Sequence, residues 1–419
     1  MRRIERKNLR APARVLDLEL MPTSQVDEDT LAVDRYSTIW CLSRMNGIPY
    51  EVSFWDVEDD AKVSIQDLRD DLCSGQTNTV TGAGATMLPP QVTDSDMTVV
   101  ICTRDRPEGL RSTLESLMDQ TDSDFRLIVV DNGTSCRKSA AVVEEFTFSY
   151  RDYLIEPRPG LSRARNRGLG AVRTQLVAWI DDDEVADPDW VRRLKEGFAH
   201  KTRPAAVCGV MLPAELQFEA QVRFEQYGGF NKGRNMTPEV LKMCTPSIIS
   251  PLYPLPAFGA GGNMAFRTES LRSIKGFDPC LGAGTRTHGC EETSVLSQLL
   301  LSGHAVLHWP PAVTWHTHRR DMSALQKQFY GYSAGLTGFY ASMIRSRPVV
   351  FFDVLMLVPH VLRDLRGGTN NLRSGNLPDD FPPNLLKASR RGLVAGGPMY
   401  LYEAITERFR RVPEVQEAI

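Results

Sequence analysis

The sequence predicts an α/β protein whose main domain is a mostly parallel mixed sheet flanked by helices, and two observations lead to this class. From Met97 onward, short apolar runs alternate with amphipathic runs, which is the spacing of strands joined by crossover helices. A Gly/Ser/Thr/Pro-rich segment precedes this alternation and predicts a linker. The predicted parts are a small N-terminal α/β or β-rich module at 1–80, a linker at 81–96, the main domain at 97–343 and a helical C-terminal extension at 344–419.

The first 80 residues carry their own pattern. The run STIWCLSRMNGIPYEVSFWDV predicts two strands around the turn residues MNG, and IQDLRDDL predicts a short helix after them. Three roles for this module stay open: it could bind a partner, an acceptor or the main domain.

The main domain is predicted element by element from its apolar runs. Strand-like runs that are apolar on both faces suit a sheet covered by two helical layers. Each is followed by a run whose apolar residues recur at helical spacing, and Ser162 is the expected N-cap of one such helix. In chain order the runs are MTVVICT, PEGLRSTLESLMDQ, FRLIVVDNG, LSRARNRGLGAVR, QLVAWI, DPDWVRRLKEGF and AAVCGVML. A further helix is expected from Arg320 to Ile344.

Composition excludes several classes. A net charge of −3 gives no global basic field, so nucleic acid is not an expected partner. The basic start MRRIERKNLR lacks the apolar core of a secretion signal. Eight scattered cysteines without a Cys-x-x-Cys pair favour reduced thiols in a cytoplasmic protein over a zinc site or disulfides.

One apolar run has two interpretations. VVFFDVLMLVPHVL, from Val349 to Leu362, is too short to span a bilayer and is interrupted by Asp353 and Pro359. It predicts either a buried helix or a helix lying on the inner membrane surface, where Arg345, Arg347, Arg363 and Arg366 would meet anionic lipid.

Polar clusters follow three of the predicted strands. They are CTRDRP at 102–107, DNG at 131–133 and DDD at 181–183. Ligands of open parallel sheets bind outside the carboxyl ends of the strands, so these clusters predict one binding site. Asp131 could accept hydrogen bonds from a base or ribose, although an Asx turn before Gly133 also fits.

The three consecutive aspartates call for an explanation because like charges repel. A solvated turn with a helix N-cap is one; a hard divalent cation held between Asp181 and Asp183 is the other. The chain has no GxxxxGK[ST] loop and no G-x-G-x-x-G after the first main-domain strand. A P-loop NTPase and a nicotinamide enzyme are therefore disfavoured.

Six segments together resemble the family 2 glycosyltransferases, which have an A-type, nucleotide-sugar-binding α/β fold. The resemblance covers about Met97 to Met343. The segments, in family order, are TVVICTRDRPEGLRSTLESL, LIVVDNGT, GLSRARNRGL, VAWIDDDEVADPDWV, GAGGNMAFRTESLRSIKGFD and CEETSVLSQLLLSGH.

The resemblance implies roles for particular residues. Gly261, Gly262 and Asn263 match the loop beside the donor sugar and acceptor. Asp181 and Asp183 match the metal-side acids, with His316 or His318, the latter preferred, as a further metal ligand. The implied nucleotide-binding residues are Thr103, Arg104, Arg106, Asp131, Arg165, Asn166 and Asp181.

The implied catalytic base is one of two glutamates. The family usually has Glu-Asp where this chain has Glu291 and Glu292, and the second acid is the base, so Glu292 is chosen and Glu291 stays open. The implied reaction is inverting transfer of a sugar from a nucleotide-diphospho-sugar, with Mn²⁺ or Mg²⁺, to a hydroxyl of a glycan, lipid-linked or small-molecule acceptor in cell-envelope or glycoconjugate synthesis. The alternatives are a sugar-phosphate nucleotidyltransferase and a non-catalytic nucleotide-sugar-binding module.

Overall fold

The computed structural model describes residues 2–21, 30–31, 33, 35–57, 63–74, 96–133, 138–231, 234–254, 257–366 and 377–409. The predicted linker at 81–96 lies outside these residues except for Asp96.

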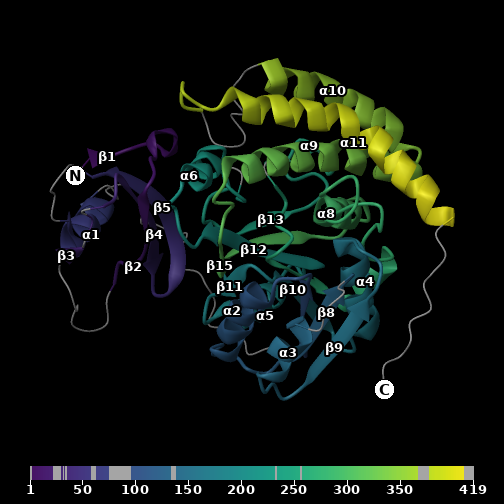
Figure 1. The fold of residues 1–419 in the computed structure, drawn as a ribbon, viewed down its shortest axis with the longest axis horizontal. Helices are drawn as coiled ribbons and strands as arrows, with labels where there is room; N and C mark the ends of the chain where they lie inside the picture. Colours follow the sequence, from purple (N-terminus) through teal and green to yellow (C-terminus); the bar gives the residue numbers. More distant parts are fainter. Residues whose placement is uncertain are drawn as a thin grey trace.

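The main domain is built on one mixed sheet (Figure 1). Its strands lie in the order β11-β15-β12-β14-β10-β7-β8-β9, and β13 pairs with β15. The neighbours β10, β7, β8 and β9 are parallel, whereas β14 runs antiparallel to both β10 and β12. The predicted fold class is therefore confirmed. The strands are β7(Met97–Thr103), β8(Arg126–Asn132), β9(Arg151–Glu156), β10(Leu176–Asp181), β11(Glu184–Ala186), β12(Ala206–Pro213), β13(Glu239–Leu241), β14(Met264–Arg267) and β15(Val306–His316).

Two apolar cores, one on each face of the sheet, explain why the strands are apolar on both sides. On one face pack α2(Pro107–Met118), α3(Lys138–Glu144) and α5(Trp190–Phe198). On the other pack α4(Leu161–Ala171), α7(Thr268–Ser273) and α8(Glu291–Leu301). The expected cap of α4 is wrong: the N-cap is Gly160, and the Ser162 hydroxyl donates to the Leu281 carbonyl at 2.7 Å.

The N-terminal module (residues 2–74) has its own four-stranded sheet, in the order β1-β5-β4-β2. The predicted hairpin is present, with Asn46 and Gly47 at positive φ in the turn. Its elements are β1(Arg2–Arg3), η1(Arg6–Asn8), β2(Ala13–Glu19), β3(Thr30–Leu31), β4(Thr38–Met45), β5(Ile48–Asp56), β6(Val63–Ser64) and α1(Ile65–Ser74).

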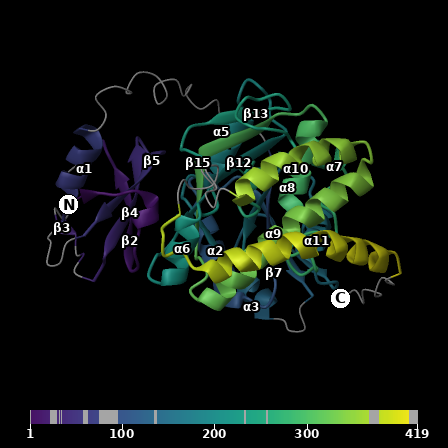
Figure 2. The same cartoon turned by 90° about the horizontal axis from the view of Figure 1, so that it is seen from above.

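This module packs against the main domain beside α6(Glu219–Gln226) (Figure 2). Trp40 and Leu42 share an apolar cluster with Val210 and Val313 of the main sheet. Arg44 also reaches across to Asp187 at 2.6 Å, where both side chains are largely buried. The two parts therefore bury a common core.

The C-terminal helices cover the main domain on one side, with α9 lying beneath α10 and α11 (Figure 1). They are α9(Met322–Ser346), α10(Val350–Arg366) and α11(Pro383–Phe409). Two glycines let α9 and α11 approach closely: a Cβ at Gly392 would lie 2.2 Å from the Tyr330 carbonyl, and one at Gly396 would lie 1.9 Å from that of Ala334.

The helix α10 is only partly covered. Val350 and Leu357 are buried, while Phe352 and Met356 are 71% and 74% exposed. The interpretation of this run as a buried helix therefore does not agree with the structure. Within the described residues no helix combines the length and apolarity needed to cross a bilayer.

Candidate active site

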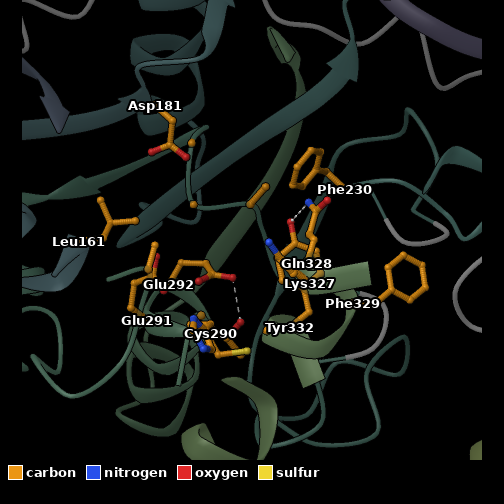
Figure 3. Close-up of a pocket in the computed structure, with 18 of the residues that line it drawn as sticks. Leu161, Asp181, Phe230, Cys290, Glu291, Glu292, Lys327, Gln328, Phe329 and Tyr332 are labelled. Carbon is orange, nitrogen blue, oxygen red and sulfur yellow. Dashed lines mark hydrogen bonds between the residues drawn. The ribbon is translucent and has the colours of Figure 1, made fainter. Parts of the chain in front are cut away.

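A cavity of about 1290 Å³ opens at the carboxyl ends of β7 and β10. Its walls also include the start of α8, the first two thirds of α9 and the loop that precedes β14. Asp181 lies on one side of this space and Glu292 on another (Figure 3). Typical ligand pockets have about 300–1,000 Å³, so this cavity has room for two substrates.

Asp181 ends β10 and is paired with a buried arginine. Arg165 Nη2 lies 3.2 Å from Asp181 Oδ1, and Arg165 Nη1 lies 2.7 Å from Glu291 Oε1. The same guanidinium donates to the Gly261 carbonyl at 3.0 Å and lies over the ring of Phe277. Arg165 therefore fixes the acid at the strand end relative to the start of α8.

Asp182 lines the cavity beside its two neighbours and is hydrogen-bonded to the loop that follows β7. It accepts from Thr103 Oγ1 at 2.7 Å and from Arg106 Nη1 at 3.2 Å. Burial, and then the charge of Asp183, raise the pKa of Asp182 to about 6. The middle aspartate thus fixes Thr103 and Arg106, which line the cavity with it.

Asp183 is the acid that could hold a metal ion. Its Oδ2 accepts a hydrogen bond from Arg106 Nη1 at 2.7 Å, and its Oδ1 lies 3.6 Å from His316 Nε2. Metal ligands lie about 2.0–2.2 Å from the ion, so one cation could contact both atoms. Oxygen and imidazole donors suit Mn²⁺. Burial alone would raise the pKa of Asp183, but this pKa is lowered. Burial lowers the pKa of His316 to about 3, so the imidazole is neutral at ordinary pH. The positive charge that lowers the pKa of Asp183 therefore comes from Arg106.

His316, and not the preferred His318, lines the cavity. Both ring nitrogens of His318 are engaged, Nδ1 with His316 Nδ1 at 2.9 Å and Nε2 with Glu225 Oε1 at 3.1 Å. His318 is also buried. The preference for His318 as a metal ligand therefore does not agree with the geometry. Among the described residues no three His, Cys, Asp or Glu side chains form a complete metal-binding group, so further ligands would have to come from substrate or water.

The two glutamates that begin α8 have different surroundings. Glu291 is buried and held by Arg165; burial, and then the charge of Glu292, raise its pKa to about 7. Glu292 is half-buried, lines the cavity and accepts from Thr293 Oγ1 at 3.2 Å. Cys290, just before them, has a left-handed backbone with φ 64°. Of the two carboxylates, Glu292 is therefore the more exposed to the cavity.

The remaining nucleotide-binding candidates divide into two groups. Thr103, Arg104 and Arg106 line the cavity. Asp131 is fully buried beside it, where the Tyr153 hydroxyl donates to Oδ2. Burial raises the pKa of Asp131, and the hydrogen bond from Tyr153 opposes the rise.

Two asparagines that the sequence placed at the site have structural roles. Asn166 donates to the Phe277 carbonyl at 2.7 Å and accepts from the Phe277 amide at 2.9 Å. Asn263 is fully buried and bonds Trp190 Nε1, Val210 O and Ala312 O. Neither lines the cavity, whereas Gly261 and Gly262 do.

Glu184 was missed by sequence reasoning. It directly follows the three aspartates, is fully buried and lies against Gly262, where an added Cβ would be 1.6 Å from Glu184 Oε1. Burial, and then the charge of Asp181, raise the pKa of Glu184 well above its usual value. The signal available in the sequence was its position at the end of the acidic run.

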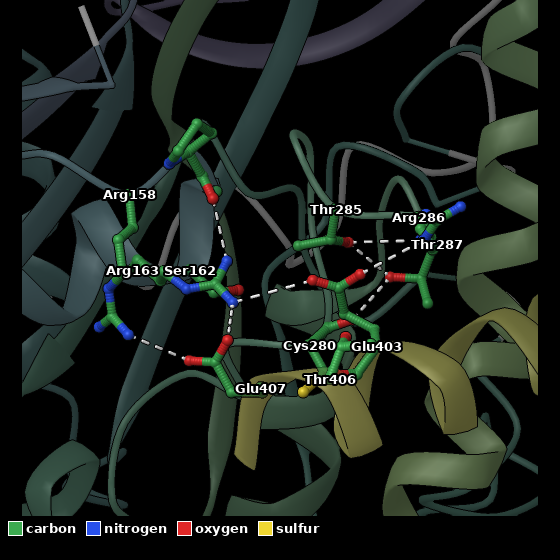
Figure 4. A network of polar contacts seen from close by, with 12 residues as sticks. Arg158, Ser162, Arg163, Cys280, Thr285, Arg286, Thr287, Glu403, Thr406 and Glu407 are labelled. Atoms are coloured by element: carbon green, nitrogen blue, oxygen red, sulfur yellow. Dashed lines mark hydrogen bonds and ion pairs between the residues drawn. The ribbon is translucent and has the colours of Figure 1, made fainter. Parts of the chain in front are cut away.

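A polar network anchors the helix α11 to the loop that begins α4 (Figure 4). Buried Arg163 lies 2.5 Å from Glu407 and 3.9 Å from Glu403. Arg158 contacts Glu407 at 3.3 Å, and Arg286 lies 3.8 Å from Glu403. Ion pairs with the glutamates of α11 thus fix the segments 158–163 and 280–287, which border the cavity.

Comparisons with known proteins concern the main domain, which contains this cavity. Residues 98–274 match the family model described as glycosyl transferase family 2. The chain is 29% identical over 247 residues to the pre-mycofactocin glycosyltransferase of Mycobacterium tuberculosis, covering 57% of this chain and 47% of that protein. It is 30% identical over 122 residues to the glucosyl-dolichyl phosphate glucuronosyltransferase of Haloferax volcanii, covering 28% and 38%.

Among solved structures, a mannosyltransferase from Pyrobaculum calidifontis in complex with GDP-Man and Mn²⁺ is 15% identical, with a TM-score of 0.44 over 78% of this chain and 80% of that one. The chain spans less than half the length of the two curated relatives. Residues 98–274 of the main domain belong to glycosyl transferase family 2.

Proposed function

We propose that this chain is an inverting, divalent-metal-dependent glycosyltransferase that moves a sugar from a nucleotide-diphospho-sugar to an acceptor hydroxyl. The observation that carries the proposal is that Glu292 and the acids of the β10 end line one cavity. One carboxylate is then available as a base, while the opposite wall carries the groups that hold a donor.

The side chains divide the work of an in-line displacement. Glu292 takes the proton from the acceptor hydroxyl, whose oxygen attacks the anomeric carbon. The bond from that carbon to the diphosphate oxygen breaks on the opposite face, so the configuration inverts. Arg104 and Arg106, which line the cavity, meet the negative charge of the nucleotide.

A divalent cation fits the donor set. Asp183 Oδ1 and His316 Nε2 would hold it, Asp181 would lie beside it, and Mn²⁺ or Mg²⁺ would neutralise the departing diphosphate. The remaining ligands would be diphosphate oxygens and water, as is usual for Mg²⁺.

A donor screen tests the proposal. Nucleotide sugars are first ranked by the rise in melting temperature, because a ligand bound only by the folded state stabilises it. Transfer is then followed with the best donor, with and without Mn²⁺, and NMR determines the anomeric configuration of the product. Release of pyrophosphate from a sugar phosphate and a nucleoside triphosphate would instead make the protein a nucleotidyltransferase. Binding without turnover would make it a binding module.

The acceptor and the location belong to the same proposal. The names of the two curated relatives refer to pre-mycofactocin and to a glucosyl-dolichyl phosphate, which supports a small-molecule or lipid-linked hydroxyl acceptor in glycoconjugate synthesis. We place the enzyme in the cytoplasm because the described cysteines are free thiols. The exposed apolar residues of α10 would rest on the inner membrane surface. Of the arginines expected to meet anionic lipid, Arg345 and Arg347 precede this helix. The side chains of Arg363 and Arg366 lie outside the described residues.

A further inference from the structure

A row of buried polar side chains leads from Asp183 to the N-terminal module. His316 Nδ1 lies 2.9 Å from His318 Nδ1, and His318 Nε2 lies 3.1 Å from Glu225 Oε1. Trp40 Nε1, on β4 of the N-terminal module, donates to Glu225 Oε2 at 3.1 Å. Each contact is within hydrogen-bond distance, so the row is continuous from the cavity wall to another part of the fold.

These side chains are sealed from water. The exposed fraction is 1% for Trp40, 6% for Glu225, 2% for His318 and 6% for His316. Phe224 packs edge-on against His318 at 4.9 Å between ring centroids, and Phe230 packs against His316 at 4.8 Å. A carboxylate buried in such surroundings is costly unless its oxygens are hydrogen-bonded. Trp40 and His318 each supply one of the two bonds to Glu225.

The donors and acceptors of the row decide which atom faces the cavity. An ionised Glu225 can only accept, so His318 Nε2 carries a proton. When His318 holds that proton alone, its Nδ1 is an acceptor and His316 Nδ1 must donate to it. His316 Nε2 is then left with a lone pair directed toward Asp183, the form of imidazole that binds a metal.

The same helix that carries Glu225 is attached to the module at a second point. Gln226 Nε2 donates to the carbonyls of Lys7 and Leu9, at 3.1 and 2.8 Å. Arg44 reaches Asp187, shortly after the aspartates of β10. The module thus holds α6 and the segment after the acidic run, in addition to supplying Trp40.

We propose that Trp40 and Glu225 are positioning residues for the metal site, so that the N-terminal module helps to orient His316 toward the cation. This inference rests on the proposed function, because it assumes that Asp183 and His316 hold the ion.

The experiment measures binding of Mn²⁺ alone, from the electron paramagnetic resonance signal of the free ion. Wild type is compared with the Trp40→Phe, Glu225→Gln and His316→Ala variants. Trp55→Phe is the matched control, because Trp55 is equally buried in the same module and also donates to a carboxylate, Asp71. Circular dichroism melting compares the loss of stability in the two tryptophan variants.

Trp40→Phe and Glu225→Gln act on His316 through His318, so they are expected to weaken Mn²⁺ binding by up to about 10–100-fold, the usual effect of changing a direct partner of a metal ligand. Trp55→Phe should bind as wild type does, even if its melting temperature falls equally. The inference would be overturned if both Trp40→Phe and Glu225→Gln bound Mn²⁺ with wild-type affinity, or if both tryptophan variants were weakened equally. Either result would leave the proposed function standing. Should Trp40→Phe fail to fold, Glu225→Gln decides. Equal binding by wild type and His316→Ala would remove the proposed histidine ligand as well.

Discussion

The acids at the end of β10 and those at the start of α8 face the same cavity, but they differ in their ion pairs with arginine. Asp181, Asp182 and Asp183 each contact an arginine at 3.2 Å or less. Glu291 is likewise paired with Arg165, whereas Glu292 makes no ion pair with any described residue. Acids that hold a substrate can be paired before it arrives; an acid that accepts a proton needs an unoccupied oxygen.

The sharpest way to break this comparison is Glu292→Gln. We expect turnover to fall about 10²–10⁴-fold, because an amide of similar size cannot take the proton. Nucleotide affinity should stay near the wild-type value, since the proposal places the donor against the β10 side. Steady-state rates and a nucleotide titration measure the two effects.

Glu291→Gln is the comparison variant for that experiment. If it abolishes turnover while Glu292→Gln remains active, the two roles are exchanged. If both variants stay active, the base lies outside this pair and the mechanism is wrong.

Asp183→Ala tests the other side of the comparison. We expect activity to fall at least about 10²-fold, to the level of wild type in excess chelator, and added Mn²⁺ to restore the wild type only. The fold should be retained, because no core packing is lost when crowded like charges are removed. Full wild-type activity in chelator would contradict the metal assignment.

Glu184→Gln sharpens the contrast between buried and cavity-facing acids. The raised pKa of Glu184 keeps this carboxyl protonated to a higher pH in the folded protein than in the unfolded chain, where it ionises above about pH 4.3. Wild-type stability should therefore fall relative to the variant by about 1.4 kcal/mol per pH unit, beginning near pH 5 and ending at the folded pKa. Urea unfolding of both proteins at several pH values measures the difference. Parallel curves would mean that Glu184 is ionised when folded.

The smallest expected effect lies outside the cavity, on α10. Phe352→Ser should weaken flotation with anionic liposomes by about fivefold, because less apolar surface enters the interface. Val394→Ser is the control, since Val394 is 79% exposed on another helix. Absence of wild-type binding at both low and high salt would exclude this face as a membrane contact.

The sequence was sufficient to predict the sheet and the polar clusters at its strand ends, because their signals are local. The choice of Glu291 and Glu292 rested on the family resemblance instead. The sequence could not assign the roles of Asn166 and Asn263, because a side-chain amide near a binding motif can equally well form hydrogen bonds with the backbone. It also preferred His318 over His316. That choice depends on Glu225 and Trp40, which are distant in the chain and become neighbours only in the tertiary structure.

The anchoring of α11 has a consequence for the order in which the protein matures. Glu407 contacts Arg163, 244 residues earlier in the chain. Contacts of such large sequence separation form late, because the loop that they close is long. During synthesis from the N-terminus, the acids of β10 emerge well before the glutamates of α11 that hold the bordering loops. The nascent chain would therefore contain the chemical groups of the site before it contains their final support.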